Sequence, residues 1–169
     1  MKIAIIGYSG SGKSTTAEFL SKKYNIPIMY LDKVHHLPNW VENTRENELK
    51  QVSKFLENNE SYIIDGNYPK LYYKHRMDEA DKIIFMNFNR FNCLFRAIKR
   101  YFKYKGKYRK SMTQGCNEKI DLKFVLWILY YGRNKERKSH YKWVVDNYSD
   151  KVIIIKNQRQ LNKFYKDLI

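Results

Sequence analysis

Short apolar runs alternate along the chain with longer segments in which apolar residues recur at helical spacing. The continuous run KIAII at 2–6 predicts a strand buried on both faces, because a half-exposed strand would alternate apolar and polar positions. Further strands and helices follow from the same reasoning. The strands are expected at 2–6, 27–31, 61–65, 82–88 and 151–155, and the helices at 13–23, 44–58, 91–104, 121–131, 134–147 and 158–168.

The order of these elements predicts the fold class. Strands that alternate with helices indicate an α/β domain built on a parallel sheet. The 169 residues are enough for one domain with a core, and two full domains would be cramped. Within that single domain we expect 104–119 to form a mobile loop and the wider stretch from about 100 to 137 to be semi-independent.

The composition argues against a membrane-spanning or exported chain. The best candidate span, FVLWILYY, has about half of the roughly 18 apolar residues that a transmembrane helix needs. The N-terminus runs from a short strand-like segment into a glycine loop and has no small-residue cleavage site, so no signal peptide is predicted. Cys93 and Cys116 lack metal-ligand spacing. Reduced thiols in a cytoplasm are therefore expected, with a lone disulfide as the alternative.

The charge is strongly basic. The chain has 33 Lys and Arg against 17 Asp and Glu, a formal net charge of +16. Such an excess suits an anionic partner, either nucleotide phosphates or nucleic acid or both. The alternative is that much of the lysine forms solvated surface in a chain rich in Lys, Asn and Tyr.

The stretch GYSGSGKST at 7–15 carries the pattern G-x-x-x-x-G-K-[ST] of a phosphate-binding loop. Its glycines let backbone N–H groups point at phosphate oxygens, and the helix that follows offers its positive end. We assign Lys13 to the β and γ phosphates of ATP and Ser14 to Mg²⁺. A plain glycine turn is the alternative. The predicted nucleotide-binding residues of the loop are Gly7, Ser9, Gly10, Ser11, Gly12, Lys13, Ser14 and Thr15.

Two acidic residues follow predicted strands. Asp65 ends SYIID and Asp32 follows PIMYL, so both are expected at the carboxyl edge of the sheet near the glycine loop. We assign Asp65 to Mg²⁺, which prefers oxygen ligands. Asp32 is then free to bind or deprotonate the hydroxyl of an acceptor. Each could instead only cap a turn. The residues that follow Asp32, namely His35, His36 and Trp40, could line an acceptor pocket, or lie in solvent or core.

Arginines are gathered around the predicted mobile loop. Arg96 and Arg100 lie four residues apart on one helix face, Arg109 lies in the loop, and Arg133 and Arg137 are again four apart beyond it. Arginines stabilise the charge on a phosphoryl group in transfer. The arrangement predicts a lid over about 100–137 that closes on the site, with a solvated basic face as the alternative.

These motifs resemble those of a known superfamily. The glycine loop, LD at 31–32, IIDGNY at 63–68, R-x-x-x-R after the fourth strand and RKSHY at 137–141 resemble small P-loop kinases of the adenylate and shikimate kinase type. A closer resemblance, over nearly the whole chain, is to the bacterial group labelled DNA topology modulation protein (FlaR-related). It rests on IIGYSGSGKST, IIDGNY, RMDEADKIIFMNFNR and QGCNEKIDLKFVLWI.

The resemblance implies a five-stranded parallel sheet in the order 2-3-1-4-5 and ATP in the glycine loop. It implies that Arg96 packs on the adenine, that Arg100 contacts phosphates and that Arg137 reaches phosphate or acceptor. The loop at 156–160, which includes Asn157, is expected to border the adenine. The core is then about 1–99 and 138–169, with an acceptor region at about 33–60. The predicted acceptor-binding residues are Asp32, His35, Trp40, Asp65, Gly66, Asn67, Arg133 and Arg137.

Together these observations predict an Mg²⁺-dependent kinase that moves the ATP γ-phosphate to a nucleotide, a nucleoside or another small hydroxyl compound. Lys13, Asp32, Arg100 and Arg137 are its predicted catalytic residues. One alternative is a nucleotide-dependent nucleic-acid-binding protein, favoured by the basic and aromatic segment KRYFKYKGKYRK at 99–110. Another is a weak ATPase or switch without an acceptor. Monomer and homodimer are both left open.

Overall fold

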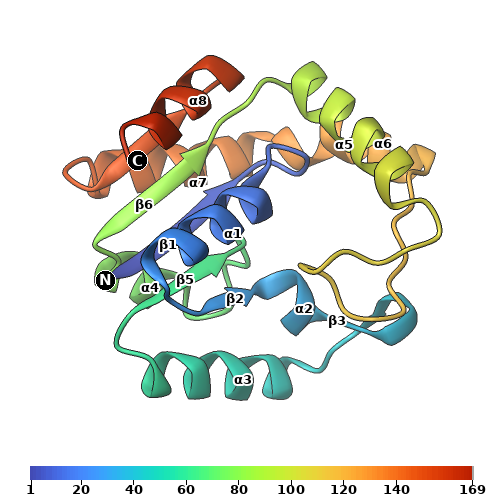
Figure 1. Ribbon diagram of the computed structural model, residues 1–169. Helices are drawn as coiled ribbons and strands as arrows, with labels where there is room; N and C mark the ends of the chain where they lie inside the picture. The colour runs from blue at the N-terminus through green and yellow to red at the C-terminus, as the bar shows by residue number, and fades with distance from the viewer. Residues whose placement is uncertain (169) are drawn as a thin grey trace.

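The computed structural model describes residues 1–168 and contains a five-stranded parallel sheet flanked by helices (Figure 1). The strand order is β2-β5-β1-β6-β7. Because the small strands β3 and β4 lie outside this sheet, that order is 2-3-1-4-5 in the five main strands, as predicted. The strands are β1 (Lys2–Gly7), β2 (Ile28–Tyr30), β5 (Tyr62–Asp65), β6 (Lys82–Met86) and β7 (Val152–Ile155).

The central strand β1 is buried along nearly its whole length, which is why its sequence is a continuous apolar run. Ile3, Ile5 and Ile6 are all 2% exposed or less. In the register of the sheet, Ile5 lies opposite Asp65 of β5 and Ile84 of β6. The carboxyl ends of β1 and β5 therefore meet at one edge, and this edge carries the site described below.

Helices cover both faces of the sheet (Figure 1). On one face α1 and α8 are joined by a 2.9 Å hydrogen bond between the hydroxyls of Thr16 and Tyr165. On the other, α4 and α7 are joined by the Tyr148 hydroxyl, which donates to Asp78 at 2.6 Å. The main helices are α1 (Lys13–Tyr24), α3 (Arg45–Asn58), α4 (Tyr73–Glu79), α5 (Arg90–Tyr104), α6 (Leu122–Leu129), α7 (Lys135–Asn147) and α8 (Gln158–Lys166).

The structure contains elements that the periodicity did not predict. Directly after β2 the chain forms a short helix, α2 (Leu31–His35), and then a small antiparallel hairpin of β3 (His36–Leu37) and β4 (Val41–Glu42). These elements are too short to show a period in the sequence. Helix α4 was also not predicted, because only Tyr73, Met77 and the unexpected Arg76 are buried in it.

The stretch between α5 and α6 has almost no regular structure, in agreement with the predicted loop at 104–119. A single bridge joins Lys105 to Glu118. Cys116 in this stretch and Cys93 in α5 are both free and buried, so the lone disulfide considered above does not form. Among residues 1–168, no helix has the length and apolar character that crossing a bilayer requires.

Candidate active site

The glycine loop connects β1 to α1, as predicted, and its backbone adopts conformations that favour glycine. Gly10 has a φ of +79° and Gly12 a φ of +99°. A β carbon on Gly10 would collide with the carbonyl oxygen of Cys93 in α5, because the loop passes directly against that helix. The loop is therefore curled tightly at the N-terminus of α1, where backbone N–H groups and the helix dipole favour an anion.

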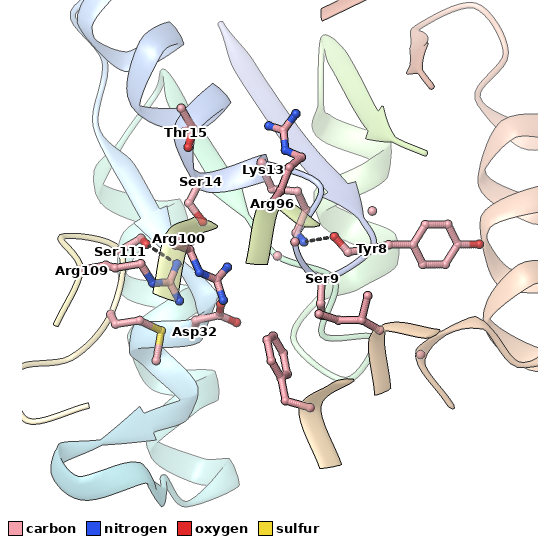
Figure 2. Close-up of a pocket in the computed structure, with 18 of the residues that line it drawn as sticks. Tyr8, Ser9, Lys13, Ser14, Thr15, Asp32, Arg96, Arg100, Arg109 and Ser111 are labelled. Carbon is pink, nitrogen blue, oxygen red and sulfur yellow. Dashed lines mark hydrogen bonds between the residues drawn. The ribbon is translucent and has the colours of Figure 1, made fainter. Parts of the chain in front are cut away.

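The Tyr8 carbonyl oxygen organises the polar side chains of the loop. The buried Ser11 hydroxyl donates to it at 2.7 Å, and the Lys13 ammonium donates to it at 3.0 Å. Figure 2 shows Lys13 held in this way across the loop. The ammonium group is thus fixed at the place where the loop would receive the phosphates, at one wall of a large cavity.

That cavity has a volume of about 1060 Å³ and brings together residues from distant parts of the chain. It is large enough for two small ligands side by side, since a drug-sized ligand occupies a pocket of about 300–1,000 Å³. Most of the residues predicted from the sequence line it. They are Gly7, Ser9, Gly10, Gly12, Lys13, Ser14, Thr15, Asp32, His35, Trp40, Gly66, Asn67, Arg96, Arg100 and Arg137.

Asp32 and Asp65 lie close together but in different environments. Asp32, in α2, is half-buried and accepts a 2.8 Å hydrogen bond from the Tyr68 hydroxyl. This bond fixes the carboxylate at the cavity wall. Burial raises the pKa of the Tyr68 hydroxyl, and the adjacent Asp32 raises it further, so Tyr68 stays protonated and remains a donor.

Asp65 is buried under the loop, and its environment disfavours a bare carboxylate. Burial raises its pKa to about 6, and the nearby Asp32 charge also raises it, while Lys13, a hydrogen bond from Ser14 and Arg109 lower it. Among the described residues, its Oδ1 atom has no hydrogen-bond partner. A buried oxygen without a partner, beside the Ser14 hydroxyl, is a donor set that suits Mg²⁺. Within residues 1–168 there is no cluster of three or more His, Cys, Asp or Glu for a metal.

The turn after Asp65 is tied to the glycine loop. Gly7 N–H donates to the Asn67 side-chain oxygen at 3.0 Å, and the Asn67 amide donates back to the Gly7 carbonyl at 2.9 Å. The segment IIDGNY runs from the end of β5 into this turn, and the reciprocal pair ties the turn to the end of the neighbouring strand β1. It connects the two segments that carry the predicted nucleotide and acceptor residues.

Arg76 of α4 stabilises the same turn by donating hydrogen bonds to its backbone, a role that was not predicted from the sequence. It is 1% exposed, and its guanidinium donates to the carbonyl oxygens of Leu71, Asn67 and Tyr68 at 2.7, 2.8 and 3.1 Å. Burial lowers its pKa to about 10, so it remains charged at neutral pH. No acidic side chain shares this contact in the described residues, and the arginine is matched by backbone oxygens alone.

Replacing Arg76 with methionine is expected to lower the free energy of unfolding by about 2–4 kcal/mol, because several buried carbonyl groups lose their donor. Urea denaturation of the Arg76→Met variant measures this loss. Arg45→Met is the matched control, since the side chain of that arginine is 41% exposed and lies 3.6 Å from Glu48 without donating to buried carbonyl groups. Equal stability of the two variants would contradict the anchoring role of Arg76.

Two of the predicted lid arginines share one buried carboxylate. Glu118 accepts from Arg100 at 2.7 Å with one oxygen and from Arg109 at 2.6 Å with the other. Figure 2 shows both guanidinium groups beside Ser111 and near Asp32. Glu118 was not predicted as a site residue, because in the sequence QGCNEK its carboxylate has no spacing that links it to the arginines.

Two other predicted arginines, Arg96 and Arg137, stack on aromatic rings near the glycine loop. Arg96 lies 4.7 Å from the Phe88 ring centroid and donates to Gln158 at 2.6 Å. Arg137 lies 4.6 Å from the Trp127 ring centroid, and the indole N–H of Trp127 donates to Ser9 at 3.2 Å. Guanidinium groups and aromatic rings of this kind can stack against a planar ring.

Some predicted residues do not line the cavity. Ser11 and Asp65 lie buried behind its wall. Arg133 donates to the Phe88 carbonyl at 2.8 Å and lies 3.7 Å from the Tyr8 ring centroid, so its guanidinium supports the wall from outside. Asn157 caps α8 by accepting from the Gln160 N–H at 2.9 Å, and it lines a separate cavity of about 320 Å³.

His35 and Trp40 line the cavity with side chains that already have partners. His35 Nδ1 lies 2.6 Å from the Glu48 carboxylate, and the Lys119 ammonium lies 5.0 Å from the Trp40 ring centroid. His36 packs edge-on between these two rings. Together they form an aromatic wall on the side of the cavity next to Asp32.

Comparison with known proteins shows a shared fold with solved structures, and no match to a protein family or to a curated protein. Among solved structures, deoxyadenosine kinase from M. mycoides with bound dATP is similar over 99% of this chain and 99% of that one, at 21% identity and a TM-score of 0.59. Shikimate kinase from Bacteroides thetaiotaomicron is similar over 99% of this chain and 95% of that one, at 18% identity and a TM-score of 0.55. The chain therefore has the P-loop kinase fold over its full length.

Proposed function

We propose that the protein is a kinase that moves the γ-phosphate of ATP to the hydroxyl of a small acceptor. The observation that carries this proposal is that Lys13, Asp32, Arg100 and Arg137, from four separate segments, line one cavity. A switch or a purely hydrolytic protein does not need a carboxylate fixed beside an aromatic wall. The solved structures of similar fold include a deoxyadenosine kinase and a shikimate kinase, which supports a hydroxyl acceptor.

Each part of the transfer has a residue suited to it. The glycine loop and Lys13 would hold the triphosphate, and the Arg96 and Gln158 side would hold its base. Asp32 would take the proton of the acceptor hydroxyl. The oxygen of that hydroxyl would bond to the γ-phosphorus, while the bond between the γ-phosphorus and the bridging oxygen of ADP breaks. Arg100 and Arg137 would neutralise the charge on the transferred group, in the lid proposed for about 100–137.

Mg²⁺ would be held by Ser14 and Asp65. When bound it supplies positive charge to the phosphate oxygens. Mg²⁺ would also give a partner to Asp65 Oδ1, which has none among the described residues and belongs to a carboxyl group whose pKa is raised by burial.

The acceptor is proposed to be a compound with a flat or ring-shaped part, because His36, Trp40 and Tyr68 line the cavity around Asp32. A nucleoside has this form. A nucleoside monophosphate would bring a second anionic group, which would compete with Glu118 for Arg109, or for Arg100 in addition to the transferred group. Neutral acceptors therefore come first among the candidates.

The direct test uses ATP labelled in its γ-phosphate, Mg²⁺, and separate panels of nucleosides, nucleoside monophosphates and small alcohols. Labelled product with one acceptor, absent from a folded Lys13→Met variant, supports the proposal. ATP binding without labelled product from any acceptor contradicts it. Release of labelled phosphate that no acceptor accelerates would instead favour the weak ATPase.

A further inference from the structure

Helix α5 exposes an apolar stripe that the proposed kinase reaction does not use. Its large apolar side chains on the outward face are Phe91, Phe95, Ile98 and Phe102, exposed by 70, 69, 37 and 70%. Their 4-3-4 spacing places them in one line along the helix. Figure 1 shows α5 at the outer rim of the molecule beside α6.

The stripe is distinct from the buried face of the same helix. Cys93 and Ala97 face the core at 0 and 1% exposure, and Arg100 turns into the cavity toward Glu118. The helix therefore has a complete inner face without the stripe. Four large apolar side chains in a row are more than the scattered apolar residues of an ordinary surface, and such patches mark interaction sites.

The charge around the stripe limits what can cover it. The 28 residues 90–117 contain no Asp or Glu and nine basic residues, namely Arg90, Arg96, Lys99, Arg100, Lys103, Lys105, Lys107, Arg109 and Lys110. Glu118 pairs with two of these, Arg100 and Arg109, and its single negative charge offsets one of them. The remaining positive charge disfavours a second copy of this helix as the partner and favours an anionic surface.

The shape of the stripe selects among anionic partners. Phe95 borders the large cavity, whereas Phe91, Ile98 and Phe102 are not among its lining residues. These three project from a convex helix, so a folded acidic protein would need a matching trough. Single-stranded nucleic acid would stack bases on aromatic rings, but Ile98 interrupts the row of rings and offers no stacking surface. A fluid bilayer adapts to a convex row of Phe and Ile side chains, with Lys99 and Lys103 beside it at the level of the headgroups.

We propose that α5 is a membrane-surface helix, whose Phe91, Phe95, Ile98 and Phe102 enter the interface of an anionic lipid bilayer. The lysines beside the stripe supply the attraction to acidic headgroups. Because Phe95, Lys99 and Lys103 also line the large cavity, one wall of that cavity would lie next to the bilayer. The proposal does not depend on phosphoryl transfer.

The test is cosedimentation with vesicles of phosphatidylcholine, with and without about one third phosphatidylserine. The buffer contains salt at about 0.15 M, because exposed charges are then screened beyond about 8 Å. Binding to the anionic vesicles only is expected. The double variant Phe91→Ser/Phe102→Ser is expected to bind at least about tenfold more weakly, because it lacks two rings whose apolar surface the bilayer would bury. Neither residue lines the cavity, so ATP binding serves as the check that the variant is folded. Val41→Ser, at a residue 55% exposed on β4, is the control and should bind as wild type.

A second measurement needs no loss of apolar surface. Phe102→Trp places a fluorophore in the stripe, and vesicles with brominated acyl chains should quench it beyond the quenching seen in wild type. Equal vesicle binding by wild type and Phe91→Ser/Phe102→Ser would show mere electrostatic adsorption and overturn the proposal. Gel-shift binding of single-stranded DNA, or dimerisation seen in sedimentation velocity, that depends on Phe91 and Phe102 while vesicles are not bound would also overturn it.

Discussion

Replacing Asp32 with asparagine is expected to slow phosphoryl transfer by about 100- to 10,000-fold, the usual contribution of a positioned general base. The change keeps the shape of the side chain, and the asparagine oxygen can still accept from the Tyr68 hydroxyl. ATP affinity should change little, because the glycine loop and Lys13 are untouched. Single-turnover transfer to the acceptor found in the panel, together with an ATP titration, measures both quantities.

Tyr68→Phe is the matched control for this experiment. It removes the 2.8 Å hydrogen bond to Asp32 but leaves the carboxylate in place, so a much smaller loss of rate is expected. An Asp32→Asn variant that transfers phosphate at the wild-type rate would exclude Asp32 as the base. A large loss of ATP affinity in the same variant would instead assign Asp32 to the nucleotide.

Replacing Asp65 with asparagine should have two opposite effects. Without ligands, Asp65→Asn is expected to raise the free energy of unfolding at pH 7.5 by about 1–3 kcal/mol. A carboxyl group whose pKa is about 6 when folded and 3.8 in its ordinary state makes folding less favourable as pH rises through that range. Asparagine does not ionise, so it removes this cost. With Mg²⁺ and ATP present, the variant should lose at least about 100-fold in activity if the carboxylate holds the metal.

The pH dependence makes the stability part of this prediction specific. At pH 5 the folded wild type has largely taken up the proton at Asp65, so the advantage of Asp65→Asn should fall to about half. Urea denaturation at the two pH values measures it. A variant that is less stable than wild type at both would mean that the Ser14 and Lys13 contacts outweigh burial.

The main strands and helices, and the glycine loop between β1 and α1, could be predicted because their signals are local. A continuous apolar run such as β1 and the spacing of Gly7, Gly12, Lys13 and Ser14 lie within single segments. The alternation of strands and helices predicts a parallel sheet, but the order of its strands was implied only by the resemblance to small P-loop kinases. The predicted Asp32 also falls at the cavity, because it directly follows β2 and parallel strands bring their carboxyl ends to one edge.

Contacts between distant segments could not be predicted in this way. Glu118 joins two arginines that lie 18 and 9 residues before it, and nothing in their spacing indicates a shared carboxylate. Arg76 looks like one of many surface arginines until its backbone partners are seen. Arg133 has the right residue type for a phosphate ligand, yet its guanidinium is engaged by the Phe88 and Ile128 carbonyls outside the cavity.

The reciprocal hydrogen bonds between Asn67 and Gly7 have a consequence for how two substrates bind. They tie the turn after β5 and the glycine loop into a single mechanical unit, which the buried Arg76 supports. A ligand that rigidifies the loop therefore also orders the turn, and the ordering cost is met only once. For the two substrates of the proposed reaction we therefore expect each to raise the affinity for the other, and thermodynamic linkage makes the two factors equal.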